Sequence, residues 1–275
     1  MKNIITNFRN LIIRNKFIKF NQGAFDNKFK KLNKKILVEF NAFHQTHCFM
    51  SVIANYLAQK NSANLVAFNN YKLTAQNFEE SIFKKIKFMI AKFFKFNFFG
   101  IYNSFGVTDF IRPTTNIKNR LKAEKITNHI FLHIKSKSDV LNIKIDKILL
   151  GDLIYDGFLK FYSLETLSYN SPKFKKYLYE FVLIYIFWKE YLSKNIIKGI
   201  VGVHGVYAYG IIYRIAFTKK IEVFTTISGR VFRLDKKNQF NFDEYKYFKK
   251  IFSKYSTSDK KKNYKIFKKY ITEKI

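Results

Sequence analysis

Apolar positions along this chain form short β-branched runs separated by longer stretches with helical spacing. A run at Lys35–Phe40 is followed by a helical pattern over Cys48–Lys60 and by a second run at Ala63–Phe68. Short apolar runs of this length are typical of buried parallel strands, and the helical stretch between them is long enough for a crossover. The sequence therefore predicts a βαβ unit here, with a right-handed crossover.

A second βαβ unit is predicted from the same kind of pattern later in the chain. The run Ile196–His204 is followed by a helical segment, Gly205–Lys220, and by the run Ile221–Thr226. Before it, Ser171–Lys194 opens with Ser-Pro, an N-cap residue and a proline at the first helical position, which predicts a long buried helix. Two such units indicate an α/β fold with a Rossmann-like parallel sheet flanked by helices.

The stretch from Asn77 to Asn97 has the spacing of an amphipathic helix, with lysines largely opposite its apolar side. An aromatic stripe at this spacing belongs in a core more often than it forms a base-stacking platform, so we expect it to be buried. The apolar positions are Phe78, Ile82, Phe83, Ile86, Ile90, Phe93 and Phe94.

The segments on either side of these elements complete the predicted organisation. Gly100–Pro113 is predicted as a loop with a short strand, and Thr115–Lys135 as a helix. Asp139–Phe161 begins with the alternation of a strand or hairpin and continues as a helix. We predict a basic N-terminal arm over residues 1–34, one Rossmann-like domain over residues 35–235, and a basic helical extension or linker over residues 236–275, where aromatic residues alternate with lysines.

The chain is strongly basic. It has 51 Lys and Arg against 19 Asp and Glu among 275 residues, a formal net charge of +32. Such a charge is typical of proteins that bind nucleic acid or an anionic membrane. However, Lys, Asn, Ile, Phe and Tyr all have AT-rich codons, and only seven basic residues are Arg, the better reader of phosphates and bases. Genome composition therefore accounts for part of the charge, and nucleic acid is the less favoured partner.

Cysteine content and the N-terminal sequence bear on location. A single cysteine, Cys48, excludes an intramolecular disulfide and suits a reducing compartment. The N-terminus lacks the uninterrupted apolar core and cleavage site of a secretory signal, and no window of 18 residues is uncharged and apolar. We expect a cytoplasmic protein, with or without peripheral contact with the inner membrane.

Candidate chemical groups follow the predicted strands. Ligands of open α/β sheets bind outside the carboxyl ends of the strands. His44 and His47 follow the first strand, and His204 ends a later one before Gly205. An imidazole at that place either takes a proton from a hydroxyl or is a buried, hydrogen-bonded histidine. The pair HQTH lacks a third ligand, and HIFLH lacks the glutamate that follows the first histidine in zincins, so no metal site is predicted.

Charged residues offer two further candidates. Asp152 and Asp156 are four residues apart and form either a site pair or an N-cap with a surface ion pair. Arg230 and Arg233 come after the last predicted strand, where they either clamp a phosphate or lie in solvent. Neither GxGxxG nor GxxxxGK[ST] occurs, so the usual phosphate cradles are missing.

Four segments together resemble a known family. KILVEFNAFHQTH, YNSFGVTDFI, GDLIYDGFLKF and VGVHGVYAYGIIYRIAFTKKIEVF, in this order between residues 35 and 235, are similar to the N-terminal half of bacterial surface or capsule polysaccharide biosynthesis glycosyltransferases of the GT-B type. The resemblance implies a Rossmann-like domain that receives a glycan or lipid-linked glycan acceptor. It also implies a second domain or partner subunit that binds the nucleotide-sugar, which is the co-substrate, with no cofactor and no metal.

The resemblance also implies roles for individual residues. His204 and His44 are candidate bases, and Asp152 is a supporting group at the catalytic site. The implied substrate-binding residues are Asn41, Asp156, Tyr207, Arg214 and Arg230. Because no second domain of comparable size follows, we expect either the N-terminal part of a longer or split enzyme or a chain that needs a partner. The rival hypotheses are a basic RNA-binding or ribosomal protein from an AT-rich genome and a scaffold without activity.

Overall fold

The structure is a computed structural model that describes most of the chain. It describes residues 2–25, 33–40, 44–69, 82–95, 98–203, 205–227, 230–240, 252–262 and 264, without the side chains of residues 2–11, 44–48, 82–85 and 227. The chain divides into two compact units, Met1–Asn241 and Phe242–Ile275. In the second unit, Ser256 Oγ accepts from the Asp259 amide at 3.1 Å, as a cap of a short helical stretch does.

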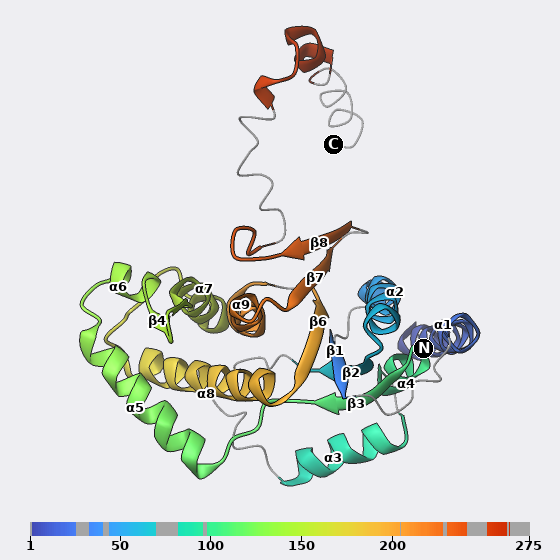
Figure 1. Cartoon of the computed structure of the whole chain (residues 1–275), viewed down its shortest axis with the longest axis horizontal. Helices are drawn as coiled ribbons and strands as arrows, with labels where there is room; N and C mark the ends of the chain where they lie inside the picture. The colour runs from blue at the N-terminus through green and yellow to red at the C-terminus, as the bar shows by residue number, and fades with distance from the viewer. Residues whose placement is uncertain are drawn as a thin grey trace. The chain divides into compact units, whose positions relative to one another are not determined.

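The first unit is built on a six-stranded sheet with the order β3-β2-β1-β6-β7-β8 (Figure 1). All neighbouring strands are parallel except β7 and β8. This arrangement confirms the predicted Rossmann-like α/β fold. The strands are β1 (Lys34–Glu39), β2 (Asn64–Phe68), β3 (Val107–Ile111), β6 (Ile196–Gly202), β7 (Glu222–Ile227) and β8 (Arg230–Leu234).

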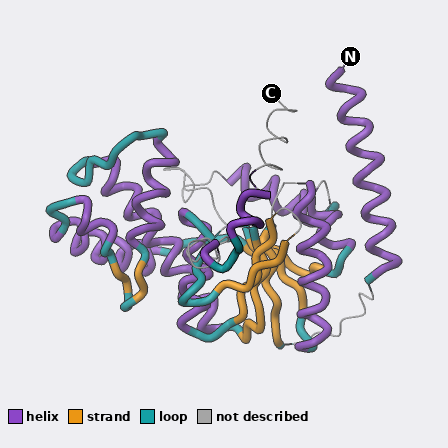
Figure 2. The backbone as a smooth tube through the Cα atoms, turned by 90° about the horizontal axis from the view of Figure 1, so that it is seen from above, coloured by secondary structure: helices purple, strands orange, loops and turns teal. Residues whose placement is uncertain are grey.

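Helices cover both faces of the sheet, which lies between them as one layer (Figure 2). One side carries α1 (Lys2–Ala24), α2 (His44–Asn61), α3 (Ile82–Phe93) and α4 (Phe98–Ser104). The other side carries α5 (Ile117–His133), α6 (Lys137–Leu141), the hairpin β4 (Lys144–Ile145) and β5 (Ile148–Leu149), α7 (Gly151–Tyr162), α8 (Pro172–Lys194), the 3-10 turn η1 (Tyr207–Gly210) and α9 (Ile211–Thr218).

Alternation along the strands explains the two layers. In β1, Ile36 and Val38 pack in the cluster that contains α2 and α4, whereas Leu37 packs in the cluster that contains α8 and α9. Successive strand residues point to opposite faces, so a strand that is apolar throughout is buried on both. The short runs in the sequence therefore predicted a central parallel sheet correctly.

The predicted helix start at Ser171 is confirmed. Ser171 Oγ accepts from the Phe174 amide at 3.2 Å, and Pro172 is the first residue of α8. This helix is largely buried, and its Trp188 side chain is fully enclosed, with its ring 5.5 Å from that of Phe68 in an edge-to-face arrangement. The only tryptophan of the chain thus lies in the core between α8 and the sheet.

Three segments differ from the predicted elements. Residues 100–104 belong to the predicted loop Gly100–Pro113 but form the end of α4, which turns into β3 through Gly106 at a positive φ of 102°. Residues 230–234 form the antiparallel strand β8, so β7 is not the last strand. Residues 2–24, predicted as part of a basic arm, form α1, whose buried Asn21 donates to Ser104 Oγ at 2.9 Å.

The aromatic stripe of α3 is the clearest error of the sequence analysis. Ile86, Ile90, Phe93 and Phe94 were expected in the core, but each is between 47% and 78% exposed. The opposite side of the helix, at Phe88, packs against the core instead. The pattern predicted an amphipathic helix correctly and its orientation wrongly.

Candidate functional site

The sheet changes its direction of winding between β1 and β6. These neighbouring parallel strands pair from Lys34 opposite Ile196 to Val38 opposite Val201. β1 leads into α2 on one face, whereas β6 leads into η1 and α9 on the other. The loops that leave two such strands diverge, and the crevice between them is where open α/β sheets bind ligands. The candidate site is therefore the carboxyl edge of β1 and β6.

Three predicted site residues belong to the loops of this edge. Asn41 follows β1 and His204 follows β6, and both lie outside the described residues. His44 is the first residue of α2, and its side chain also lies outside the described part. The chain positions of the two candidate bases fit the switch point, and their mutual geometry stays a prediction.

A buried carboxylate at this edge was missed by the sequence analysis. Glu39, the last residue of β1, is 3% exposed. Its Oε2 accepts from the Val203 amide at 2.8 Å and from the Tyr213 hydroxyl at 3.1 Å. Its backbone carbonyl accepts from the Tyr102 hydroxyl at 2.5 Å. The signal was present, because Glu39 is the only acidic residue in the run KILVEF.

Glu39 joins the ends of β1 and β6 directly. Burial, the charge of Glu39 and the hydrogen bond to Glu39 hold the pKa of Tyr213 well above its usual value. Burial first, and the Glu39 charge second, also raise the pKa of Tyr209. Both phenols therefore stay protonated at neutral pH, and Tyr213 remains a donor to Glu39. The carboxylate fixes the amide at position 203, one residue before His204.

A second polar contact joins the segments GDLIYDG and GIIYRIA. Asp152 Oδ2 lies 2.5 Å from Nη2 of Arg214, whose Nη1 donates to the Leu149 carbonyl at 3.1 Å. The guanidinium also lies over the Phe240 ring at 5.2 Å. Arg214 is buried and Asp152 is partly exposed, at 4% and 29% of their side chains. Because the cation is enclosed, this is not the surface ion pair considered for Asp152.

Asp152 is also not an N-cap. The N-cap position of α7 is Leu150, and Asp152 lies in the first turn of the helix. Within the described part of the chain, Asp152 Oδ1 and Arg214 Nε are buried without a hydrogen-bond partner. Partial burial, and then the Asp152 charge, raise the pKa of the exposed Asp156 one turn later. The Asp152 charge therefore acts on Asp156, as the spacing of the two carboxylates suggested.

Tyr207 lies where α7 packs against η1. Its φ of 54° is in the left-handed region, which is strained for a residue with a large side chain. A Cβ added at Gly157 would lie 3.5 Å from the Tyr207 Cβ and would overlap the Tyr177 hydroxyl. The structure thus places Tyr207, Asp152 and Arg214 in one assembly of α7, η1 and α9.

Arg230 lies elsewhere on the sheet edge. It was predicted to follow the last strand, but it is the first residue of β8, is exposed, and pairs in register with Ile227. Two strands, β6 and β7, lie between β8 and β1 in the sheet order. Arg233 lies further along β8 and its Nη2 is 3.1 Å from Glu222 Oε1. The two arginines therefore do not act as a pair at the switch point.

Other features of the described chain do not coincide with this edge. A cavity of about 480 Å³ is lined by α5 and α8 residues, including Glu124 and Lys175, and contains none of the predicted site residues. Among the described residues, no three His, Cys, Asp or Glu side chains are placed to hold a metal ion. His133 Nδ1 instead lies 2.6 Å from the His129 carbonyl. No helix within the described ranges is long and apolar enough to cross a membrane.

Comparison with protein-family models, with curated proteins and with solved structures finds no match to this chain.

Proposed function

We propose that this chain is the acceptor-side domain of a glycosyltransferase that builds a bacterial surface polysaccharide. The observation that carries the proposal is the change of winding between β1 and β6, because the segments with the candidate bases, the start of α2 at His44 and the loop after β6, leave the sheet there. The resemblance of four segments to capsule-type glycosyltransferases supports it. Two of those segments, which contain Asp152 and Arg214, are in direct contact.

The chemistry proposed for this edge is a proton transfer coupled to sugar transfer. In an inverting reaction, the imidazole of His204 or His44 takes the proton of an acceptor hydroxyl. The hydroxyl oxygen forms a bond to the anomeric carbon, and the bond from that carbon to the nucleotide phosphate breaks. The nucleoside diphosphate leaves from a second domain or a partner subunit that binds the nucleotide-sugar.

Glu39 and the remaining predicted residues divide into two groups by their contacts. Glu39 holds the Val203 amide, and Asp152 pairs with Arg214, so in this proposal these three act as positioning residues for the loop after β6 and for α7. Asp156 is exposed and has a raised pKa, which suits a hydrogen bond to a sugar hydroxyl. Tyr207, in its strained conformation, lies in η1 close to Gly157 of α7.

The test combines glycan binding with sugar transfer. The chain is expected to bind oligosaccharides on an array of bacterial surface glycans and, with nucleotide-sugars and its donor-side partner, to extend them. His204→Ala should lower the transfer rate by about 10²-fold or more without weakening glycan binding, because a general base contributes on that order. His129→Ala on α5 is the control and should transfer at the native rate. Native transfer by His204→Ala would remove the base assignment.

A second candidate function, the binding of single-stranded nucleic acid, is supported by the unit Phe242–Ile275. Its described residues include the exposed aromatic side chains of Phe252, Tyr255 and Tyr264 among several lysines. Basic side chains interleaved with aromatic rings bind single-stranded nucleic acid through phosphate contacts and base stacking. Salt-sensitive retention on RNA, with no glycan bound on the array, would favour this function over sugar transfer.

A further inference from the structure

Helix α3 presents its apolar side to solvent. The exposed fractions are 48% for Ile86, 67% for Met89, 47% for Ile90 and 78% for Phe93. These residues recur at intervals of three and four, so they lie on one side of the helix. Scattered exposed apolar residues are ordinary on a protein surface, but a contiguous row of large ones marks a surface that binds something.

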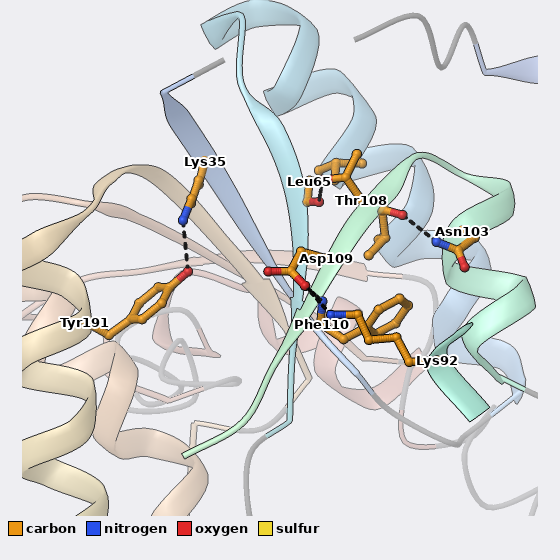
Figure 3. A network of polar contacts seen from close by, with 9 residues as sticks. Lys35, Leu65, Lys92, Asn103, Thr108, Asp109, Phe110 and Tyr191 are labelled. Atoms are coloured by element: carbon orange, nitrogen blue, oxygen red, sulfur yellow. Dashed lines mark hydrogen bonds and ion pairs between the residues drawn. The ribbon is translucent and has the colours of Figure 1, made fainter. Parts of the chain in front are cut away.

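Contacts on the opposite side fix this orientation. The Phe88 ring lies 5.3 Å from the Phe99 ring, and the Arg112 guanidinium lies 4.5 Å from the centre of the Phe88 ring. Lys92 Nζ lies 2.5 Å from Asp109 Oδ1 on β3, as Figure 3 shows. The helix is therefore held beside the β3 edge of the sheet by its polar side and Phe88 (Figure 1). Its outward side is the one that the sequence predicted to be in the core.

The charged residues of α3 and of the sequence next to it, from position 81 to 108, are all lysines. Lysines occur at positions 84, 85, 87, 92 and 95, and no acidic residue occurs between Glu80 and Asp109. Lys87 and Lys95 are exposed, whereas Lys92 is engaged with Asp109. A helix with large apolar residues on one side, lysines beside them and no carboxylates has the composition of interfacial helices that bind anionic lipid.

We propose that α3 is a membrane-surface helix that lies in the headgroup region of an anionic bilayer, with Met89 and Phe93 inserted toward the acyl chains. The helix has 12 residues, which is about 18 Å of length. The hydrocarbon core of a bilayer is about 30 Å thick, so a helix this short lies along the surface rather than across it. Lysines at its borders would contact the anionic headgroups. This inference does not depend on the proposed sugar transfer.

The same observations disfavour the other occupants. A second copy of this chain would bring like charges together, since the net charge is +32 and Lys87 and Lys95 are exposed near this side. A nucleic acid would meet the lysines and the Phe93 ring, but Ile86, Met89 and Ile90, the other three residues of this side, provide no ring on which a base can stack. Anionic lipid matches both the positive charge and the aliphatic surface.

Vesicle flotation of the full chain tests the proposal. The probes are vesicles of phosphatidylcholine alone and vesicles of phosphatidylcholine and phosphatidylglycerol in a ratio of about 7 to 3. We expect binding to the anionic vesicles that weakens as salt is raised. The double variant Met89→Ser/Phe93→Ser should reduce partitioning about tenfold or more, because two exposed apolar side chains no longer insert. The variant Lys87→Glu/Lys95→Glu should reduce binding to anionic vesicles to the level seen with phosphatidylcholine.

A matched control is available on α5. Leu121 and Leu132 are 56% and 77% exposed, so Leu121→Ser/Leu132→Ser removes a similar apolar surface at another place and should leave binding unchanged. Equal binding by the α3 variant and the native chain would overturn the proposal. An α3 variant that keeps vesicle binding but loses retention on RNA would also overturn the proposal. The same holds for an α3 variant whose only change is from a dimer to a monomer in sedimentation. Because all the substituted positions are exposed, the variants should fold like the native chain. The fluorescence of the buried Trp188 checks that they do.

Discussion

Gly202→Ala is expected to destabilise the chain by about 3 kcal/mol or more. A Cβ added at Gly202 would overlap the Tyr213 hydroxyl and lie 2.6 Å from Glu39 Oε2. Tyr213 is fully enclosed and Glu39 is buried, so neither can move aside without breaking their hydrogen bond. The substitution therefore both overpacks the end of β6 and leaves a buried carboxylate with one donor fewer. Urea unfolding followed by Trp188 fluorescence measures the loss.

Gly199→Ala in the same strand is the matched control. There, an added Cβ would lie 3.3 Å from the Ile36 Cδ1 and 3.4 Å from the Leu57 Cδ1. Both are methyl ends of flexible side chains that can shift by a few tenths of an ångström. We expect a change in unfolding free energy within about 1 kcal/mol. If Gly202→Ala were as stable as Gly199→Ala, the Glu39–Tyr213 contact would not organise the end of β6.

Asp152→Ala is expected to destabilise the chain by about 2–3 kcal/mol. The variant leaves the Arg214 guanidinium buried without its carboxylate, with the Leu149 carbonyl and the Phe240 ring as its remaining contacts. A buried charge that has lost its partner is costly because water cannot replace it. We place the loss at the lower end of the range for buried pairs, since Asp152 itself is partly exposed.

Two further variants separate the pair from a general effect of mutation. Glu190→Ala on α8 removes the carboxylate beside Lys194, an exposed pair with 3.7 Å between the charged atoms, and should cost less than about 0.5 kcal/mol. Asp152→Leu combined with Arg214→Met should recover most of the stability lost in Asp152→Ala, because no unpaired charge remains. A double variant as unstable as Asp152→Ala would mean that side-chain packing, rather than the ion pair, sets the effect.

The central layer of the fold could be predicted because its inner strands contain short, largely apolar runs. A parallel strand that is buried on both faces appears in the sequence as a nearly continuous apolar run. Such runs at β1, β2, β6 and β7 stand out from the lysine-rich sequence around them. The Ser-Pro start of α8 is equally local, because an N-cap hydrogen bond depends on residues three apart. Features set by neighbouring residues were predicted correctly.

Features that depend on residues distant in the sequence were not predicted. The stripe of α3 predicts a helix, but which side packs depends on Phe99, Asp109 and Arg112, and the helix's own sequence says nothing of them. Glu39 looks like one charge in a strand until Tyr213 and Val203 are seen to donate to it from 164 or more residues away. α4 is only seven residues long, too short for a helical period to be distinguished from a loop.

The place of the candidate site follows from the order of the elements, since parallel strands share the direction of their carboxyl ends. That His44 and His204 meet at this edge stays a prediction. The contact between Asp152 and Arg214 could not be predicted from the sequence, because it joins the first turn of α7 to α9 across 62 residues. Arg230 was misplaced because β8 reverses direction after β7, and a five-residue strand with two arginines carries a weak pattern.

Hydrogen–deuterium exchange of the native chain, with and without an oligosaccharide that it binds on the array, tests the central claim most directly. If the carboxyl edge of β1 and β6 receives the acceptor, protection should concentrate in peptides that cover residues 39–50, 150–158 and 203–214. Peptides of α5 and of residues 252–264 should exchange at the same rate in both states. Protection confined to the peptides of α5 and of residues 252–264, with the peptides after β1 and β6 unchanged, would contradict the account.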